Sequence, residues 1–163
     1  PGKHIFGEAN NPLPSSKVLR VQEAFKKAGI QFDTPVDMMR MLWWKFMVNV
    51  GVNQASAVLR APYGVFHTNE NASALMDALM QEVVILARAS GINLTPQDVL
   101  DWYPVLHTLS PEGKTSMLQD VEAGRQTEVD VFGGEVVKLG GQLNIPTPVN
   151  QAIVNIIKVI EKY

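Results

Sequence analysis

The chain has 163 residues, of which 46% are hydrophobic and 18% charged, and its formal net charge is −2. With 14 basic and 16 acidic residues and no basic run, the composition argues against a nucleic-acid or anionic-membrane role. Cysteine is absent, which excludes disulfides, thiol catalysis and cysteine-ligated zinc and fits a cytoplasmic protein. No uninterrupted apolar run reaches the roughly 18 residues that a transmembrane helix needs.

The first 33 residues predict a strand, a helix and a second strand. Residues 4–6 and 30–32 are short apolar segments, and between them a helix begins at Ser15 or Ser16 and ends at Gly29. Two strands do not form a stable sheet alone. Because the chain also begins without methionine, we expect this segment to be the end of an α/β sheet whose other strands precede it.

An incomplete sheet should expose an apolar surface. We expect that surface around Ile5, Phe6, Ile30 and Phe32, and we expect another segment or a second copy of the chain to cover it. The low charge content of the chain agrees with a covered surface.

After Asp33 the pattern is helical throughout. Four predicted helices begin at a hydroxyl residue followed by proline, which supplies an N-cap and a first helical residue that needs no donor. These pairs are Thr34-Pro35, Thr95-Pro96, Ser110-Pro111 and Thr147-Pro148. The spacing predicts helices over 36–59, 70–90, 96 to before 104, 111–123, 128–143 and 148–163. The sequence therefore predicts a mainly α protein, with a truncated α/β segment at 1–34 and an all-α domain at 35–163.

The longest predicted helix carries a polar stripe. Residues 43–59 are apolar on nearly every side, which is typical of a buried helix. Yet Lys45, Asn49 and Asn53 recur every four residues, so they stack along one edge, and Ser56 falls in the same sector. We expect these groups to be buried and to need partners, since an unsatisfied buried polar group costs roughly 1–3 kcal/mol. Either they bond the protein's own backbone, or they face a cleft and bind a polar ligand. Three polar residues in register, one of them lysine, favour the cleft.

A lysine in such a cleft could act in two ways. A desolvated lysine has a lowered pKa and can give a proton to a substrate oxygen. A lysine held positive by a carboxylate can instead polarise a carbonyl or bind an anion. The structural alternative for Lys45 is an apolar stem that packs while the amine stays in water.

A second group of polar residues lies at 115–128. Ser116 and Asp120 share a helix face, Gly124 ends that helix, and Glu128 sits at the start of the next one. From spacing alone, Glu128 is more simply a stabilising charge at a helix N-terminus, worth roughly 0.3–1 kcal/mol.

Two kinds of site lack a sequence signature. His4, His67 and His107 are isolated and show no ligand spacing, so we interpret them as incidental and predict no metal site. A dinucleotide-binding turn needs a G-x-G-x-x-G pattern after a strand, and the 12 glycines include no G-x-G. Gly133-Gly134 and Gly140-Gly141 fall within or at the end of a helix, where we predict close packing or fraying.

The motifs resemble one protein family. Trp43-x-Lys45-x3-Asn49-x3-Asn53 resembles the start of the C-terminal domain of the ketopantoate reductases (2-dehydropantoate 2-reductases). The segments 116–120 (SMLQD) and 124–128 (GRQTE) are similar to that family's second signature. The resemblance covers the chain from about Ile5 to its end.

The resemblance implies a Rossmann domain that binds NADPH, followed by an all-α domain like the C-terminal domain of 6-phosphogluconate dehydrogenase. This chain would be the end of the first and all of the second. The implied reaction is hydride transfer from NADPH to the ketone of a 2-oxo acid, giving pantoate on the way to pantothenate and coenzyme A. Carried over by position, the resemblance implies that Lys45 is the catalytic lysine and that Asn49, Asn53 and Ser116 bind substrate. It implies that Glu128, near the lysine, is a catalytic residue that also binds the cofactor.

This chain departs from the family pattern in two ways. The glycine turn that holds the nucleotide is absent, so we expect the 163-residue chain to fold but not to bind NADPH or to reduce substrate alone. Tyr63 stands where well-studied members carry an asparagine that touches substrate, which leaves the exact 2-oxo acid open. A competing hypothesis is a non-enzymatic helical module for interaction or dimerisation, and a homodimer is compatible with either hypothesis.

Overall fold

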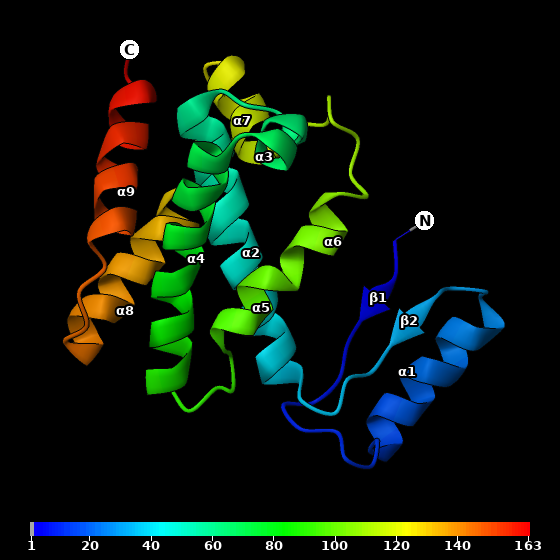
Figure 1. Cartoon of the computed structure of the whole chain (residues 1–163). Coiled ribbons are helices and arrows are strands. Elements are labelled where there is room, and N and C mark those ends of the chain that lie inside the picture. Colours follow the sequence, from blue (N-terminus) through cyan, green and yellow to red (C-terminus); the bar gives the residue numbers. More distant parts are fainter. Residues whose placement is uncertain (1) are drawn as a thin grey trace. The chain divides into compact units, whose positions relative to one another are not determined.

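The structure is a computed structural model that describes residues 2–163 (Figure 1). The chain divides into two compact units, one reaching to Trp43 and one running from Trp44 to Tyr163. The described residues form a two-stranded sheet and otherwise helices, so the predicted mainly α class is confirmed.

The first unit is a β-α-β segment. Strands β1 (His4–Ile5) and β2 (Phe32–Asp33) pair in parallel, and α1 (Ser16–Lys27) connects them. Phe25 of α1 packs edge-on against Phe6 and Phe32, with ring centroids 5.2 and 6.0 Å apart. Strand β2 begins at Phe32, later than the predicted second strand at 30–32.

Packing by Phe25 also changes the expected apolar surface. Ile5 and Ile30 are exposed as predicted, at 41% and 38%. Phe6 and Phe32 are half-buried, because the Phe25 ring covers them.

Helix α2 (Met38–Leu59) begins later than the Thr34-Pro35 pair predicts. The residues between are held in an extended bridge, in which the Asn11 N–H donates to the Val36 carbonyl. Asp37 takes the capping role instead, since its carboxylate accepts the Arg40 N–H at 2.8 Å. A long-range backbone pairing has thus overridden the local capping signal.

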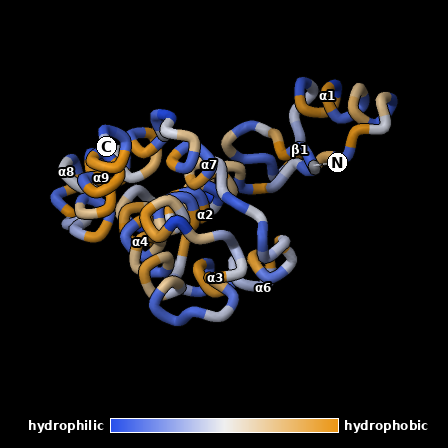
Figure 2. The backbone as a smooth tube through the Cα atoms, turned by 90° about the horizontal axis from the view of Figure 1, so that it is seen from above, coloured by the Kyte–Doolittle hydropathy of each residue, from blue (hydrophilic) through white to orange (hydrophobic). Residues whose placement is uncertain are grey.

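The second unit packs around α2, which is mostly buried from Met47 to Ala57. The other helical elements are α3 (Tyr63–Thr68), α4 (Glu70–Ala89), α5 (Pro96–Leu100), α6 (Trp102–Leu106), α7 (Ser116–Glu122), the π-helical turn η1 (Asp130–Gly134), α8 (Glu135–Leu143) and α9 (Pro148–Ile160). Helices α4, α8 and α9 contact one another, and hydrophobic segments run along α4 and α9 (Figure 2). No described helix is both long and apolar enough to span a membrane.

Two predicted helices of the second unit differ from the observed ones, and one observed helix was not predicted. The segment predicted from 96 onward splits into α5 and α6, and α3 was not predicted. The predicted 111–123 helix begins only at Ser116, because the turn before it pairs with α3. In that turn the carbonyls of Pro111 and Gly113 accept the N–H groups of Gly64 and Tyr63, at 2.8 and 2.9 Å.

The predicted 128–143 helix opens as the π-helical turn η1, at a point of close packing. A Cβ on Gly133 would overlap Gln54 Oε1 of α2 and lie 2.6 Å from Val154 Cγ2 of α9. The prediction that this glycine serves close packing is therefore confirmed.

We expect Gly133→Ala to lower the free energy of unfolding by about 1–3 kcal/mol, because overpacking forces neighbouring helices apart. Gly141→Ala in α8 is the matched control, since nothing lies within 4 Å of its would-be Cβ. The control should be neutral or stabilise by about 0.4–1 kcal/mol. Urea unfolding of both variants checks this, and equal free-energy changes would contradict the packing argument.

Candidate functional site

The polar stripe of α2 runs from the surface into the core. Lys45 is exposed, Asn49 is half-buried and Asn53 is only 7% exposed. The prediction of a buried Lys45 is therefore wrong. Lys45 lies before the buried part of α2, which begins only at Met47.

The stripe residues have no internal partner. Within residues 2–163, the side chains of Lys45, Asn49 and Asn53 make no hydrogen bond or ion pair. Ser56, in the same sector, does make one, since its hydroxyl donates to the Ala61 carbonyl at 2.7 Å. Backbone bonding thus accounts for Ser56 alone, and the other three side chains keep their donors and acceptors available to a ligand.

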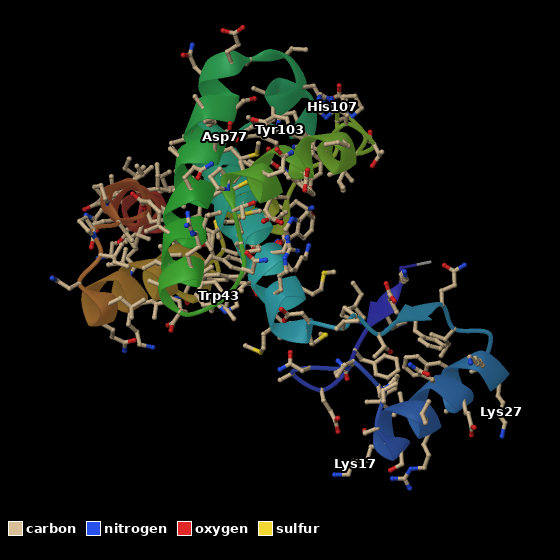
Figure 3. The ribbon with its side chains drawn as sticks, turned by 60° about the horizontal axis from the view of Figure 1, so that its bottom comes forward. Lys17, Lys27, Trp43, Asp77, Tyr103 and His107 are labelled. Atoms are coloured by element: carbon tan, nitrogen blue, oxygen red, sulfur yellow. The ribbon has the colours of Figure 1, made fainter. Side chains whose placement is uncertain are left out.

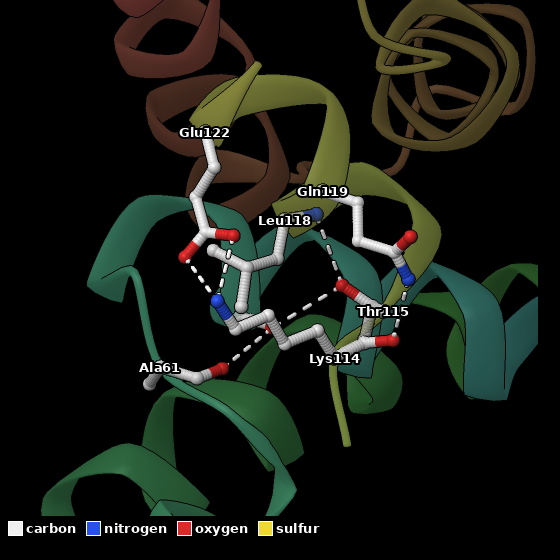
Figure 4. Close-up of polar contacts among 7 residues, drawn as sticks. Ala61, Lys114, Thr115, Leu118, Gln119 and Glu122 are labelled. Atoms are coloured by element: carbon white, nitrogen blue, oxygen red, sulfur yellow. Dashed lines mark hydrogen bonds and ion pairs between the residues drawn. The ribbon is translucent and has the colours of Figure 1, made fainter. Parts of the chain in front are cut away.

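The residue before Ser116 is bonded to α2. Thr115, the buried N-cap of α7, accepts the Leu118 N–H at 3.1 Å and donates to Ser56 Oγ at 3.2 Å (Figure 4). This bond joins the start of α7 to α2 one turn beyond Asn53. Ser116 itself is exposed, and it is the first residue of α7.

The capping role of Thr115 was not predicted, although a threonine directly before a helical segment is a recognisable N-cap signal. Asp120, predicted to share the Ser116 face, is paired with Arg125 through Nε and Nη2, at 2.8 and 2.7 Å. We therefore leave Asp120 out of the candidate site.

Glu128 lies just before η1 and is exposed. Its backbone carbonyl accepts the N–H groups of Val131 and Phe132, and its carboxylate has no partner among the residues that the structure describes. The neighbouring Thr127 fixes this segment, because its N–H and hydroxyl both donate to Glu161 Oε1 at 2.8 and 2.7 Å. No hydrogen bond or ion pair in the described part of the chain joins Glu128 to the stripe, so its catalytic role stays a prediction.

Two of the histidines come together, contrary to their interpretation as isolated residues. The ring centroids of His67 and His107 lie 4.9 Å apart. With Asp77 of α4 and Tyr103 of α6 they line a cavity of about 410 Å³. Asp77, Tyr103 and His107 are labelled in Figure 3. No set of three or more His, Cys, Asp or Glu residues in the described range is arranged to hold a metal ion.

Tyr103 and Asp77 are joined by a hydrogen bond at the wall of this cavity. The Tyr103 hydroxyl donates to Asp77 Oδ1 at 2.8 Å. Burial, together with the hydrogen bond to the carboxylate, raises the pKa of Tyr103 to about 12. Burial also raises the pKa of Asp77. This pair ties α6 to α4, and no local pattern in the sequence could have placed the two residues together.

Comparison with known proteins adds independent evidence. The family model described as "Ketopantoate reductase PanE/ApbA C terminal" matches residues 37–161. A curated 2-dehydropantoate 2-reductase from Pyrobaculum aerophilum is 35% identical over 151 residues, which cover 91% of this chain and 53% of that protein.

Solved structures agree with the fold. A crystal structure of a PanE/ApbA family ketopantoate reductase from Ralstonia eutropha matches with a TM-score of 0.84 at 28% identity, covering 99% of this chain and 52% of that one. A dimeric ketopantoate reductase from Staphylococcus aureus shares the fold, with a TM-score of 0.79 at 21% identity over 91% of this chain and 52% of that one. The chain spans about half the length of the relatives it matches.

Proposed function

The chain belongs to the ketopantoate reductase family, and we propose that it is the substrate-binding and catalytic half of an NADPH-dependent reductase of 2-oxo acids. The substrate we propose is 2-dehydropantoate, which the reaction converts to pantoate. One observation carries the proposal: Lys45, Asn49 and Asn53 lie in register on one helix, and their polar groups have no partner among residues 2–163. We also propose a cytoplasmic location, which suits a chain without cysteine.

The chemistry follows from the residue types. Hydride addition to the ketone carbon moves the carbonyl electron pair onto oxygen, and the ammonium of Lys45 stabilises that charge and gives its proton. Because Lys45 is exposed, solvent can return the proton after each turnover. The amides of Asn49 and Asn53 and the hydroxyl of Ser116 suit the carboxylate and hydroxyl of the substrate.

When bound, NADPH supplies the hydride. The stripe fits a 2-oxo acid better than a dinucleotide, because a pyrophosphate is held by backbone N–H groups of a glycine turn after a strand. Residues 2–163 contain no such turn. We therefore assign only Glu128 to the cofactor side, where an exposed carboxylate can accept hydrogen bonds from hydroxyl or amide groups.

NADPH oxidation by the complete protein tests this function. We expect turnover of 2-dehydropantoate in preference to 2-oxo acids that lack its hydroxyl, such as pyruvate and 2-oxobutanoate. If no 2-oxo acid is reduced, the competing hypothesis of a non-enzymatic helical module is favoured. A preference for another 2-oxo acid would support the reductase function and would attribute the difference in substrate specificity to the region of Tyr63.

We also propose that the protein assembles as a homodimer, which sedimentation of the complete protein would check.

We expect Asn49→Ala and Asn53→Ala to raise the KM for the 2-oxo acid by roughly 10- to 100-fold, as loss of a hydrogen bond to a charged group would. The dissociation constant for NADPH should stay nearly unchanged, because the stripe faces the substrate. Asn155→Ala, on the exposed side of α9, is the control and should change neither constant. A large loss of NADPH affinity in both stripe variants would show that the stripe faces the nucleotide or holds the fold.

A further inference from the structure

A second cavity of about 410 Å³ lies at the end of α2, where the chain turns into α3 and reaches the first turn of α4. Its apolar wall includes Leu59, Pro62 and Val65, and its polar rim includes Asn69 and Asn71. Arg60 is the only ionisable side chain among the residues that line it. The volume falls within the roughly 300–1,000 Å³ of small-molecule sites.

The backbone of Arg60 is in a left-handed conformation, with φ +49°. It follows the last residue of α2, and the Ala61 N–H closes the helix by donating to the Ser56 carbonyl at 3.0 Å. Helices usually carry glycine at this position, because a side chain there is strained.

Four other described helices end in this conformation. Gly29, Gly91 and Gly124 end α1, α4 and α7 with φ of 67°, 79° and 63°, and Asn144 ends α8 with φ 55°. Asparagine is the usual substitute for glycine at such a helix end. The end of α2 therefore carries an arginine where three of these helices have glycine and one has asparagine. Retaining a charged side chain at a strained position is a recurring mark of a functional residue.

The Arg60 guanidinium is available to a ligand. It is exposed, and it makes no ion pair or hydrogen bond with any residue in 2–163. Glu70, the acidic residue that begins α4, lines the neighbouring histidine cavity instead of this one. A planar cation beside an apolar wall complements a carboxylate attached to a short aliphatic chain.

This cavity is distinct from the substrate stripe. Arg60 follows Lys45 by fifteen positions, which is roughly 22 Å along the helix axis and longer than a small 2-oxo acid. The buried bond between Ser56 and Thr115 occupies the stretch of α2 between Asn53 and Arg60. One small acid therefore cannot contact both Lys45 and Arg60.

We propose that Arg60 and this cavity form a second binding site, for a small aliphatic monocarboxylate. The guanidinium binds the carboxylate, the wall of Leu59, Pro62 and Val65 packs against the aliphatic chain, and the amides of Asn69 and Asn71 lie at the rim. The inference does not rest on reductase activity, because none of these residues belongs to the stripe.

The test is an NMR titration of the ¹⁵N-labelled chain with 3-methylbutanoate at low ionic strength. We expect saturable shifts of the Asn69 and Asn71 side-chain amides. Arg60→Gly should weaken binding by roughly 10- to 100-fold, the loss expected for a charge-assisted hydrogen bond. The same variant should unfold at an equal or higher temperature, because glycine adopts the left-handed conformation without strain. If Arg60 had only a structural role, Arg60→Gly would not weaken binding while leaving the unfolding temperature equal or higher.

Further variants and probes sharpen the result. Arg60→Lys keeps the charge but loses the fork of donors, so its affinity should fall between those of wild type and Arg60→Gly. Arg88→Gln, at the opposite end of α4, should bind as wild type does. Absence of saturable shifts, or unchanged binding by Arg60→Gly, would overturn the site. Equal affinity for the neutral 3-methylbutanamide would overturn the anion role, and tighter binding of inorganic phosphate would overturn the carboxylate.

Discussion

Replacing Lys45 by alanine in the complete protein is expected to lower kcat by about 10²- to 10⁴-fold, the usual contribution of a positioned proton donor. The free energy of unfolding should change by less than about 0.5 kcal/mol. The structure gives the reason for this separation. Lys45 is exposed and has no partner in the described part of the chain, so its removal leaves no buried group unsatisfied. Steady-state NADPH oxidation and thermal unfolding, measured on the same preparation, check both halves.

Two controls isolate the proton donor. Lys45→Met keeps the apolar stem, so it should lose as much turnover as Lys45→Ala if the ammonium is what matters. Lys138→Ala removes an exposed lysine from α8, where it pairs with Glu135 at 3.0 Å, and should leave kcat unchanged. Near-normal turnover of Lys45→Met and Lys45→Ala would remove Lys45 from the mechanism.

The sequence predicted those features that depend on neighbours along the chain. Thr95, predicted to begin a helix, forms a capping box with Asp98 at α5, because both partners lie within one turn. The four-residue spacing of Lys45, Asn49 and Asn53 likewise placed them on one edge of α2, since helical periodicity is a local property.

Features that depend on distant partners could not be predicted. The burial of Lys45 was misjudged because periodicity does not tell where enclosing helices end. The bond from Thr115, the residue before Ser116, to Ser56 of α2 joins residues that are 59 positions apart. The pairing of His67 with His107 has the same origin, because α3 and α6 meet only in the folded chain.

The start of α9 shows this limit most clearly. The sequence predicts Thr147 as its N-cap, but the Thr147 side chain makes no cap hydrogen bond. Glu82 of α4, 67 residues away from Val149, does so instead. Its buried carboxylate accepts the Val149 N–H at 2.8 Å, the Asn150 N–H at 3.0 Å and Asn150 Nδ2 at 2.7 Å. A negative charge here also suits the positive end of the helix dipole.

This carboxylate links three helices. Asn150 of α9, which donates to Glu82, accepts in turn from Gln54 Nε2 of α2 at 2.9 Å. Gln54 also donates to the Val50 carbonyl at 2.9 Å, and both amide side chains are fully buried. Loss of Glu82 therefore affects the contacts among α2, α4 and α9 together.

Glu82→Ala should consequently lower the free energy of unfolding by at least about 3 kcal/mol, because hydrogen bonds to charged groups contribute roughly 1.5–3 kcal/mol each. That is a large share of the roughly 5–15 kcal/mol that stabilises a domain. Urea denaturation followed by circular dichroism measures it. Glu82→Gln keeps the volume and one acceptor oxygen, so its free energy of unfolding should fall by about half as much, whereas that of the exposed Glu135→Gln should change little.

Thr147→Val separates the two explanations of the α9 cap. If the local signal governs, this variant loses about 1 kcal/mol and Glu82→Ala loses little; if the carboxylate from α4 governs, the order is reversed.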